Sequence, residues 1–443
     1  FLISVTERKL YMKNRKALAL IAILALVAAA CGGSDGGSDE AVVEVETTEA
    51  PATTEAPTTT AAPAPASDPL ILASLMPLSG DLASLGPGIA LGAALAVEQI
   101  NAAGGINGQP VQLIEGDSGC DGAVALTSLN DVIAQGAQGV MGAACSGTSL
   151  AILDTAIAAE VVMVSPSNTS PQFTKIDKKG FYARTAPSDL LQGDVLASLL
   201  VEDGVQTVSI ISRADSYGRG LAEATAAAFE AAGGTVKTIV YHATDATEFT
   251  SEVTAVGKGA PDAIVGILFP ETGCGVLQPA FEQGLLDTPW YMTDGVKDAG
   301  LASLCGLGTA LDGFKGTAPG SAAGEAKDAF EAAYAGVSAD GSPTFIFAPQ
   351  AYDAVMLMAI SAAANGVTGP EIASGLVAAS SGGEKCIGVA CIALAADGVD
   401  VDYVGASGEI ELNAVGDPTA ATYDIWTTEG DTNPVLKSVD FGS

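Results

Sequence analysis

Residues 68–117 read DPLILASLMPLSGDLASLGPGIALGAALAVEQINAAGGINGQPVQLIEGD, and this stretch predicts one strand–helix–strand unit. The short apolar run Leu70–Met76 is bounded by turn residues, as expected of a buried strand. Apolar residues recur at helical spacing over Ile89–Ile100, and the glycines that follow are typical of a helix C-terminus. Val111–Glu115 predicts the second strand. This order of elements indicates a parallel sheet covered by helices.

The same alternation continues along the chain and begins afresh near Leu190. Further helices are expected over Leu126–Ile133, Leu150–Ala159, Leu190–Leu200, Leu221–Ala231 and Phe249–Val256, and further strands over Gly139–Ala143, Val161–Val164, Thr207–Ile211, Thr235–Tyr241 and Ala263–Leu268. Two such series predict an α/β fold with two doubly wound parallel-sheet lobes. Because open α/β sheets bind ligands beyond the carboxyl ends of their strands, function is expected in the loops after the strands.

The N-terminal segment has the composition of a secretory signal. A basic segment, Lys13–Lys16, is followed by the apolar run Ala17–Val27, which is too short for a transmembrane helix of about 20 residues. We therefore interpret residues 1–30 as a signal peptide. Met12 stands where such a signal should begin, which leaves open whether residues 1–11 are translated.

Cys31 directly follows three alanines, in a pattern that resembles the lipobox of bacterial lipoproteins. In that motif the cysteine is lipidated and becomes the new N-terminus; the usual leucine three positions earlier is Ala28 here. The alternative is an ordinary signal peptide with a chance cysteine. The rest of residues 31–67 is rich in Thr, Ala, Pro and Glu, and such a linker is expected to be disordered. The prediction is an extracytoplasmic protein that only a lipid anchors to the bacterial cell membrane.

Composition excludes several classes of function. About 375 residues remain after the linker, enough for two lobes of ordinary size. The formal net charge of −34 argues against nucleic acid or an anionic membrane surface as a partner. The one histidine, His242, is expected at the surface and excludes a histidine-rich metal site. The sequence has no G-x-S-x-G motif and no P-loop, so we expect no catalytic residue, no metal, no cofactor and no enzyme.

Several strand-end segments carry a family resemblance. They read MPLSGDLASLG, AVEQINAAGGINGQPVQL, GDSGCD, GVMGAACSGTS, VVMVSPSNTSP, SRADSYGRG and YMTDG. Their order resembles the type I periplasmic binding proteins, in particular the branched-chain amino-acid (leucine/isoleucine/valine) binding family, from Asp68 to about Gly320; the C-terminal part fits more loosely. The resemblance implies two lobes joined by a hinge, with lobe I formed by residues 68–186 and 320–416 and lobe II by residues 187–319 and 417–443.

The resemblance also implies a function. Such a protein would be a monomer that captures a small solute between its lobes and delivers it to an ABC-transporter permease powered by a separate ATPase. The solute would be a branched-chain amino acid or a similar one, with an amide, urea or another small solute as the alternative. An extracellular sensor module and a hydrolase with unrecognised residues are the rival classes.

The family's binding residues can be carried over one by one. Ser146 matches a serine that binds the solute's carboxylate, although a serine at this strand-to-helix turn also suits a plain helix N-cap. Thr169 matches a threonine that contacts the solute, and Asn168 a residue that contacts it through the backbone; a simple turn is the alternative. Asp294 stands where the family usually has a glutamate for the ammonium group, but Asp-Gly is also a common turn.

Three further positions are expected to form the walls of the site. Tyr217 should come from the second lobe and close over the solute. Phe269 matches a family tyrosine without its hydroxyl, or else is a core residue. Leu85 stands where leucine-binding members have an aromatic wall. The departures at Phe269, Leu85 and Asp294 leave the identity of the solute open.

Seven cysteines are present, and the six that remain beside Cys31 indicate disulfides in an exported chain. Cys120 and Cys145 match the family's disulfide pair. Cys386 and Cys391 are close enough in sequence for a local bridge, and Cys274 and Cys305 would then pair by elimination, although the pairing of these four stays open. Zinc is the rival explanation, but the sequence has no C-x-x-C motif.

Overall fold

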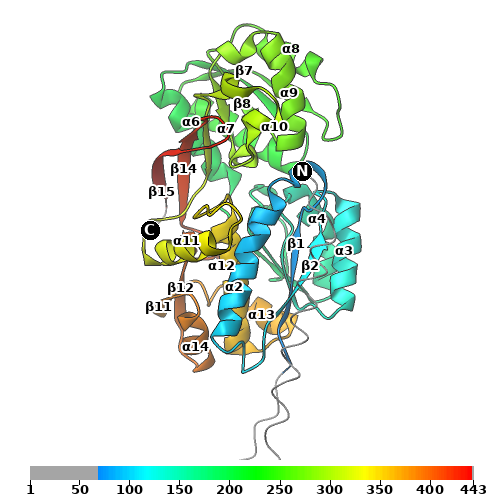
Figure 1. Cartoon of the computed structure of the whole chain (residues 1–443), viewed down its shortest axis with the longest axis vertical. Helices are drawn as coiled ribbons and strands as arrows, with labels where there is room; N and C mark the ends of the chain where they lie inside the picture. The colour runs from blue at the N-terminus through cyan, green and yellow to red at the C-terminus, as the bar shows by residue number, and fades with distance from the viewer. Residues whose placement is uncertain (1–67, 442–443) are drawn as a thin grey trace, which may run out of the picture. The chain divides into compact units, whose positions relative to one another are not determined.

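The computed structural model describes residues 68–441, which contain a five-stranded sheet in the part that we call lobe I (Figure 1). All five strands are parallel and follow the order β2-β1-β3-β4-β5. The elements are β1 (Ile71–Met76), η1 (Gly80–Leu82), α2 (Gly86–Ala102), β2 (Gln112–Asp117), α3 (Gly122–Ala134), β3 (Gly139–Gly142), α4 (Ser146–Ala158), β4 (Val162–Ser165), α5 (Gln172–Lys175) and β5 (Tyr182–Arg184). The expected strands and helices of this region form, with ends shifted by a few residues.

A seven-stranded sheet forms the second part, lobe II, in the order β15-β14-β10-β9-β8-β6-β7. Its elements are α6 (Asp189–Glu202), β6 (Thr207–Arg213), α7 (Ser216–Ala231), β7 (Thr235–His242), α8 (Thr250–Gly257), β8 (Ala263–Ile267), α9 (Pro270–Glu282), η2 (Leu285–Asp287), β9 (Trp290–Met292), η3 (Asp294–Val296), α10 (Leu301–Leu304), η4 (Gly308–Leu311), β10 (Lys315–Pro319), β14 (Ala421–Thr427) and β15 (Val435–Phe441). The α/β prediction with two parallel-sheet lobes is confirmed.

One edge of the lobe II sheet differs from a purely parallel arrangement. Strand β14 runs antiparallel to β10, and β15 runs antiparallel to β14. Only residues 428–434 connect β14 to β15, and a parallel pair would need a crossover of about a dozen residues or more. The short connection therefore imposes the antiparallel edge.

The chain between β10 and β14 returns to lobe I and completes its core. It forms α11 (Glu325–Val337), α12 (Ala348–Asn365), α13 (Gly369–Gly375), β11 (Glu384–Ile387), α14 (Ala390–Ala396), β12 (Val401–Gly405) and β13 (Gly408–Glu409). Every residue of α12 from Ala348 to Ala362 is buried, as expected of a helix with apolar residues on most sides. Helix α12 packs closely on α2: a Cβ at Gly92 would lie 2.2 Å from the carbonyl oxygen of Ala348. The small sheet β11-β12-β13 was not expected.

The six cysteines of the described region form three disulfides. They join Cys120 to Cys145, Cys274 to Cys305, and Cys386 to Cys391. The first of these ties the loop after β2 to the residue that precedes α4. The structure thus contains the Cys120–Cys145 disulfide that the resemblance implies, and it also contains the two pairings suggested for the other four cysteines.

Several predictions lie outside the described residues. These are the signal peptide of residues 1–30, the lipidated Cys31 and the linker of residues 31–67. The exact bounds of the two lobes also stay a prediction. Within residues 68–441, no helix combines the length and the apolar character that crossing a bilayer requires.

The expectation that His242 lies at the surface is wrong. Its side chain ends β7 and is 1% exposed. Phe249, from the start of the next helix, covers the imidazole edge to face, with 5.0 Å between the ring centroids. Nδ1 lies 3.0 Å from the carbonyl oxygen of Ala243, and burial lowers the pKa of the imidazole. The covering aromatic comes from beyond the strand, so the strand pattern alone does not indicate this burial.

Candidate functional site

Loops that follow the strands of both lobes meet around one small cavity. Its lining residues are Leu82, Leu85, Ile89, Ala144, Cys145, Ser146, Ser167, Tyr217, Phe269, Asp294, Gly295 and Phe347. Five of the seven predicted binding residues are among them: Leu85, Ser146, Tyr217, Phe269 and Asp294. The structure therefore brings together residues that lie far apart in the sequence, at the carboxyl ends of parallel strands.

Ser146 is the first residue of α4, and Cys145 is the N-cap of that helix. The interpretation of Ser146 as a plain N-cap is therefore wrong. The first bond within α4 runs from the N–H of Ser149 to the carbonyl of Cys145, so the N–H groups of the first turn have no partner in the helix. They and the Ser146 side chain, which is 3% exposed, provide hydrogen-bond donors next to the cavity. A helix N-terminus of this kind favours an anionic group.

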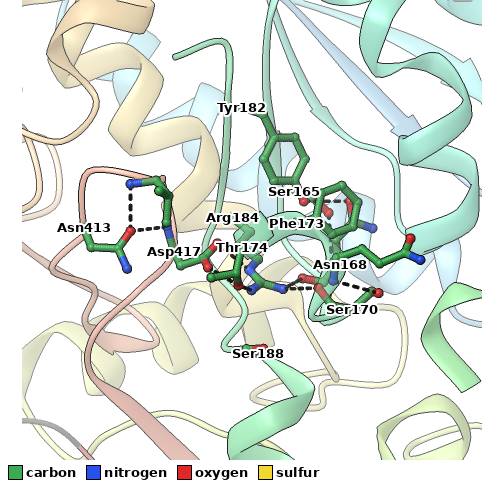
Figure 2. Close-up of polar contacts among 12 residues, drawn as sticks. Ser165, Asn168, Ser170, Phe173, Thr174, Tyr182, Arg184, Ser188, Asn413 and Asp417 are labelled. Atoms are coloured by element: carbon green, nitrogen blue, oxygen red, sulfur yellow. Dashed lines mark hydrogen bonds and ion pairs between the residues drawn. The ribbon is translucent and has the colours of Figure 1, made fainter. Parts of the chain in front are cut away.

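Asn168 lies in the loop after β4, where its polar groups bind other parts of the protein (Figure 2). Its N–H donates to Ser165 Oγ at 3.1 Å, and its carbonyl accepts from Arg184 Nη1 at 3.1 Å. Its side-chain amide donates to the carbonyls of Ala143 and Ala144, which precede α4. Asn168 thus fixes the two loops to each other. It is absent from the cavity lining, and its contact with a solute stays a prediction.

A buried ion pair holds the same loop from the other side. Arg184 is fully buried, and its Nε lies 2.9 Å from Asp417 Oδ1. Its Nη1 donates to the carbonyls of Asn168 and Ser170 at 3.1 and 3.0 Å. In Figure 2 the Arg184 guanidinium lies between Asp417 and this loop. Because all these groups are partnered and buried, the loop backbone is rigidly positioned beside the cavity.

Asp294 provides the negative charge of the cavity. It begins η3, directly after β9, and its side chain is 4% exposed. Its Oδ1 accepts hydrogen bonds from Gln192 Nε2 at 2.8 Å and from the Tyr217 hydroxyl at 3.0 Å. Burial raises the pKa of this carboxyl to about 6, although both hydrogen bonds act in the opposite direction. Among the described lining residues it is the one with a charged side chain.

Asp189 is a second buried carboxylate beside this site, and the sequence patterns did not identify it. It opens α6, is fully buried, and neither carboxylate oxygen has a hydrogen-bond partner within the protein. Its N–H donates to the carbonyl of Thr169 at 2.8 Å, and the Thr169 hydroxyl is also buried without a partner. Burial, and next the charge of Asp294, raise the pKa of Asp189 well above its ordinary value. A buried carboxyl whose oxygens accept no hydrogen bond is suited to a cationic group.

The remaining walls are aromatic and aliphatic. The rings of Tyr217 and Phe269 are stacked with 5.4 Å between centroids, and both side chains come from lobe II. The Tyr217 hydroxyl lies 2.9 Å from Thr293 Oγ1. Leu85 is 2% exposed and belongs to the aliphatic wall on the lobe I side. The site therefore combines a polar end with an apolar side.

Comparison with known proteins identifies the family. A family model described as "periplasmic binding protein" matches residues 69–385. The chain belongs to the periplasmic binding protein family. Among curated relatives, the "amino acid binding protein" of Pseudomonas aeruginosa is 34% identical over 238 residues, which are 52% of this chain and 62% of that protein. The "leucine-, isoleucine-, valine-, threonine-, and alanine-binding protein" of the same organism is 29% identical over 304 residues, 67% of this chain and 78% of that protein.

Solved structures have the same fold as this periplasmic binding protein. One is the branched-chain amino acid transporter substrate binding protein LivJ from Streptococcus pneumoniae, in complex with isoleucine. It aligns with a TM-score of 0.70 at 23% identity and covers 85% of this chain and 100% of its own. At this identity the likeness concerns the fold.

The site of this periplasmic binding protein can therefore hold opposite charges a short distance apart. The N-terminus of α4 offers N–H donors, whereas Asp294, Asp189 and Thr169 offer acceptors. No sequence signal separated Asp189 from an ordinary acidic residue in a first helical turn, where such residues are common. Its role follows only from the fold, which buries it next to Asp294.

Proposed function

We propose that the chain is the extracytoplasmic solute-binding component of an ABC importer and that it captures an amino acid between its lobes. The observation that carries this proposal is the charge arrangement of one site: N–H groups at the start of α4 that have no partner in the helix, the carboxylate of Asp294 in the cavity lining, and the buried carboxyl of Asp189 near Asp294. A free α-amino acid presents a carboxylate and an ammonium group, which these two sets of groups would bind.

Each part of the solute has a counterpart in the site. The carboxylate would accept hydrogen bonds from Ser146 and the first N–H groups of α4. The ammonium group would bind Asp294, with Asp189 and Thr169 as further acceptors. The solute's side chain would lie along the aliphatic wall; its residues are Leu82, Leu85 and Ile89. An apolar wall favours a branched-chain or similar aliphatic amino acid, consistent with the name of the relative that binds leucine, isoleucine, valine, threonine and alanine.

Tyr217 and Phe269 would close over the solute from lobe II by a hinge motion. The loaded protein, a monomer, would then deliver the solute to a membrane permease that is powered by a separate ATPase. Lipidation of Cys31 would tether it outside the bacterial cell membrane. We infer that it is not an enzyme, since His242, the one histidine of the chain, is absent from the cavity lining.

Two alternatives make different demands on the site. An amide, urea or another small solute would use the hydrogen-bond acceptors but not both charged ends. An extracellular sensor module would bind the same amino acid without delivering it to a permease. The first alternative explains less well than amino-acid capture why N–H donors and carboxylates lie at one site, whereas a sensor module would use the same site.

Isothermal titration calorimetry of the purified protein tests the proposal. The panel should hold L-leucine, L-isoleucine, L-valine, L-alanine, acetamide and urea. We expect heat and saturation with at least one of the α-amino acids and none with the two amides. Absence of binding to every α-amino acid, or binding of urea or acetamide alone, would reject the amino-acid proposal.

A further inference from the structure

A short segment of lobe I, residues 80–85, reaches across to lobe II. Its Asp81 Oδ2 lies 2.7 Å from Arg213 Nη1, and Arg213 ends strand β6 of lobe II. Three positions on, the Ser84 hydroxyl donates to Glu271 Oε1 at 3.2 Å, and Glu271 lies in the first turn of α9. The segment therefore binds two separate elements of lobe II. Leu82 and Leu85, from the same segment, form part of the solute cavity wall.

Arg213 has partners in its own lobe as well as in this segment of lobe I. Its side chain is 3% exposed, and its Nε lies 2.9 Å from Asp215 Oδ2 within its own lobe. Its Nη1 also donates to the Thr272 hydroxyl at 3.1 Å. Among the ion pairs of residues 68–441, those of Asp417 with Lys178 and Arg184 lie where the chain crosses between the lobes, and Asp81–Arg213 connects the lobes beside the cavity. Since Asp215 stays beside Arg213 whether or not Asp81 is near, opening the lobes does not leave the guanidinium without a counter-ion.

The other face of Arg213 contacts the aromatic wall of the cavity. The guanidinium carbon lies 3.9 Å from the centroid of the Phe269 ring, a cation–π contact. Phe269 stacks on Tyr217, and the Tyr217 hydroxyl donates to Asp294. A continuous series of contacts thus runs from Asp81 in lobe I, through three side chains of lobe II, to the carboxylate of the solute site.

We propose that Arg213 is a positioning residue for solute capture: its ion pair with Asp81 forms on lobe closure and fixes the Phe269–Tyr217 wall against the bound solute. This proposal rests on the proposed function, since it concerns the residence of the solute. The ion pair exists only while the lobes are together, so its free energy belongs to the closing equilibrium and not to the folding of either lobe. Loss of the pair should therefore act on solute release.

Solute kinetics with L-leucine as the probe test this assignment. Asp81→Ala removes the lobe I partner. We expect the dissociation rate constant, from stopped-flow fluorescence, to rise by roughly tenfold, because a partly buried ion pair is lost from the closed form alone. The association rate constant and the melting temperature of the solute-free protein should stay unchanged. Asp81→Glu keeps the charge and should restore most of the slow release.

A matched control is available in lobe I. Glu331→Gln also removes one carboxylate from an ion pair, a more exposed one with Lys327 at 3.6 Å that lies within a single helix and does not connect the lobes. It should leave both rate constants unchanged. The assignment is overturned if Asp81→Ala leaves the dissociation rate unchanged, if Glu331→Gln raises it equally, or if Asp81→Ala lowers the melting temperature of the solute-free protein, since that result would make the pair a stabiliser of the fold.

A second measurement separates failure of this inference from failure of the proposed function. Spin labels on Asp131→Cys in α3 and Glu230→Cys in α7, both exposed positions of different lobes, report the distance between the lobes. If the wild-type protein binds no α-amino acid of the calorimetry panel, the proposed function fails, but this distance still tests the ion pair. We expect Asp81→Ala to reduce the closed fraction in electron-spin distance measurements by several-fold relative to Glu331→Gln. An identical distance distribution in the two variants would overturn the inference.

Discussion

The affinity for an amino acid should decrease as the pH is lowered, because Asp294 becomes protonated. Burial raises the pKa of this carboxyl from 3.8 to about 6 in the solute-free protein. Leucine itself stays a zwitterion between about pH 5 and pH 7.5, so the site and not the solute titrates. If the ammonium group requires the ionised carboxylate, the dissociation constant increases about tenfold per pH unit below the pKa. It should therefore be about tenfold larger at pH 5 than at pH 7.5.

Asp189 should act in the same direction, because burial and the charge of Asp294 raise its pKa as well. The two carboxyls then titrate as a coupled pair, which can make the pH dependence steeper. Calorimetry in buffers of different ionisation enthalpy measures both the affinity and the protons released on binding. We expect proton release that grows as the pH falls toward about 6.

Asp294→Asn is the control for this prediction. It should weaken binding of L-leucine at about pH 7.5 by roughly 2 kcal/mol, about 30-fold, through loss of a charged hydrogen bond, and reduce the pH dependence of the affinity to the part that Asp189 contributes. The free energy of unfolding of the solute-free protein should depend on pH in the opposite sense to the affinity: it should be higher at low pH. A raised pKa in the folded state means that the folded protein binds the proton more tightly, so this stabilisation is complete below pH 3.8 and is lost as the pH rises through about 6. Relative to Asp294→Asn, the wild-type free energy of unfolding should fall by up to about 3 kcal/mol across that window. Wild-type affinity that does not change from pH 7.5 to pH 5 would refute the assignment of Asp294.

Four further outcomes are expected. Ser146→Ala should weaken L-leucine binding by about 1–3 kcal/mol, measured by calorimetry, and unchanged affinity would move the carboxylate site elsewhere. Replacing both Cys120 and Cys145 by serine removes a disulfide between residues that are 25 apart in the sequence. The free energy of unfolding, measured by urea denaturation, should fall by about 3 kcal/mol. Asp353→Asn should lower the free energy of unfolding by about 2 kcal/mol, since the buried carboxylate accepts four hydrogen bonds from residues 403–407. A urea midpoint equal to that of the wild-type protein would contradict that role. Cys31→Ala should abolish incorporation of a radioactive fatty acid, and persistent labelling would disprove the anchor.

The fold could be predicted because its signals are local. Apolar runs and helical periodicity from Leu70 to Leu268 located most strands and helices of this range to within a few residues, but the short strand β5 was not predicted, nor were β9 and β10 beyond Leu268. The antiparallel edge formed by β14 and β15 and the small sheet around Cys386 were missed, since these strands follow a long helical segment with no comparable alternation. His242 was misplaced because its cover, Phe249, comes from the next element.

The candidate site could be predicted only in part. Ser146 and Asp294 stood out because they follow strands and match a family pattern, and both line the cavity. Asp189 and Arg213 match no such pattern. The importance of each comes from its burial and from a neighbour more than 75 residues away in the sequence, which is Asp294 for Asp189 and Asp81 for Arg213. Contacts of this range depend on tertiary structure, which a single sequence does not display.

The central claim is that one cavity recognises both charged ends of an amino acid, and analogues of leucine test it most directly. Calorimetric titration with L-leucine should be compared with 4-methylpentanoate, which lacks the ammonium group, and with 3-methylbutylamine, which lacks the carboxylate. The account predicts saturable binding of L-leucine or its nearest aliphatic relatives, and loss of about 2 kcal/mol or more, at least roughly 30-fold in affinity, for each analogue. An analogue that binds as tightly as the parent amino acid would contradict the claim that the missing charged group is recognised.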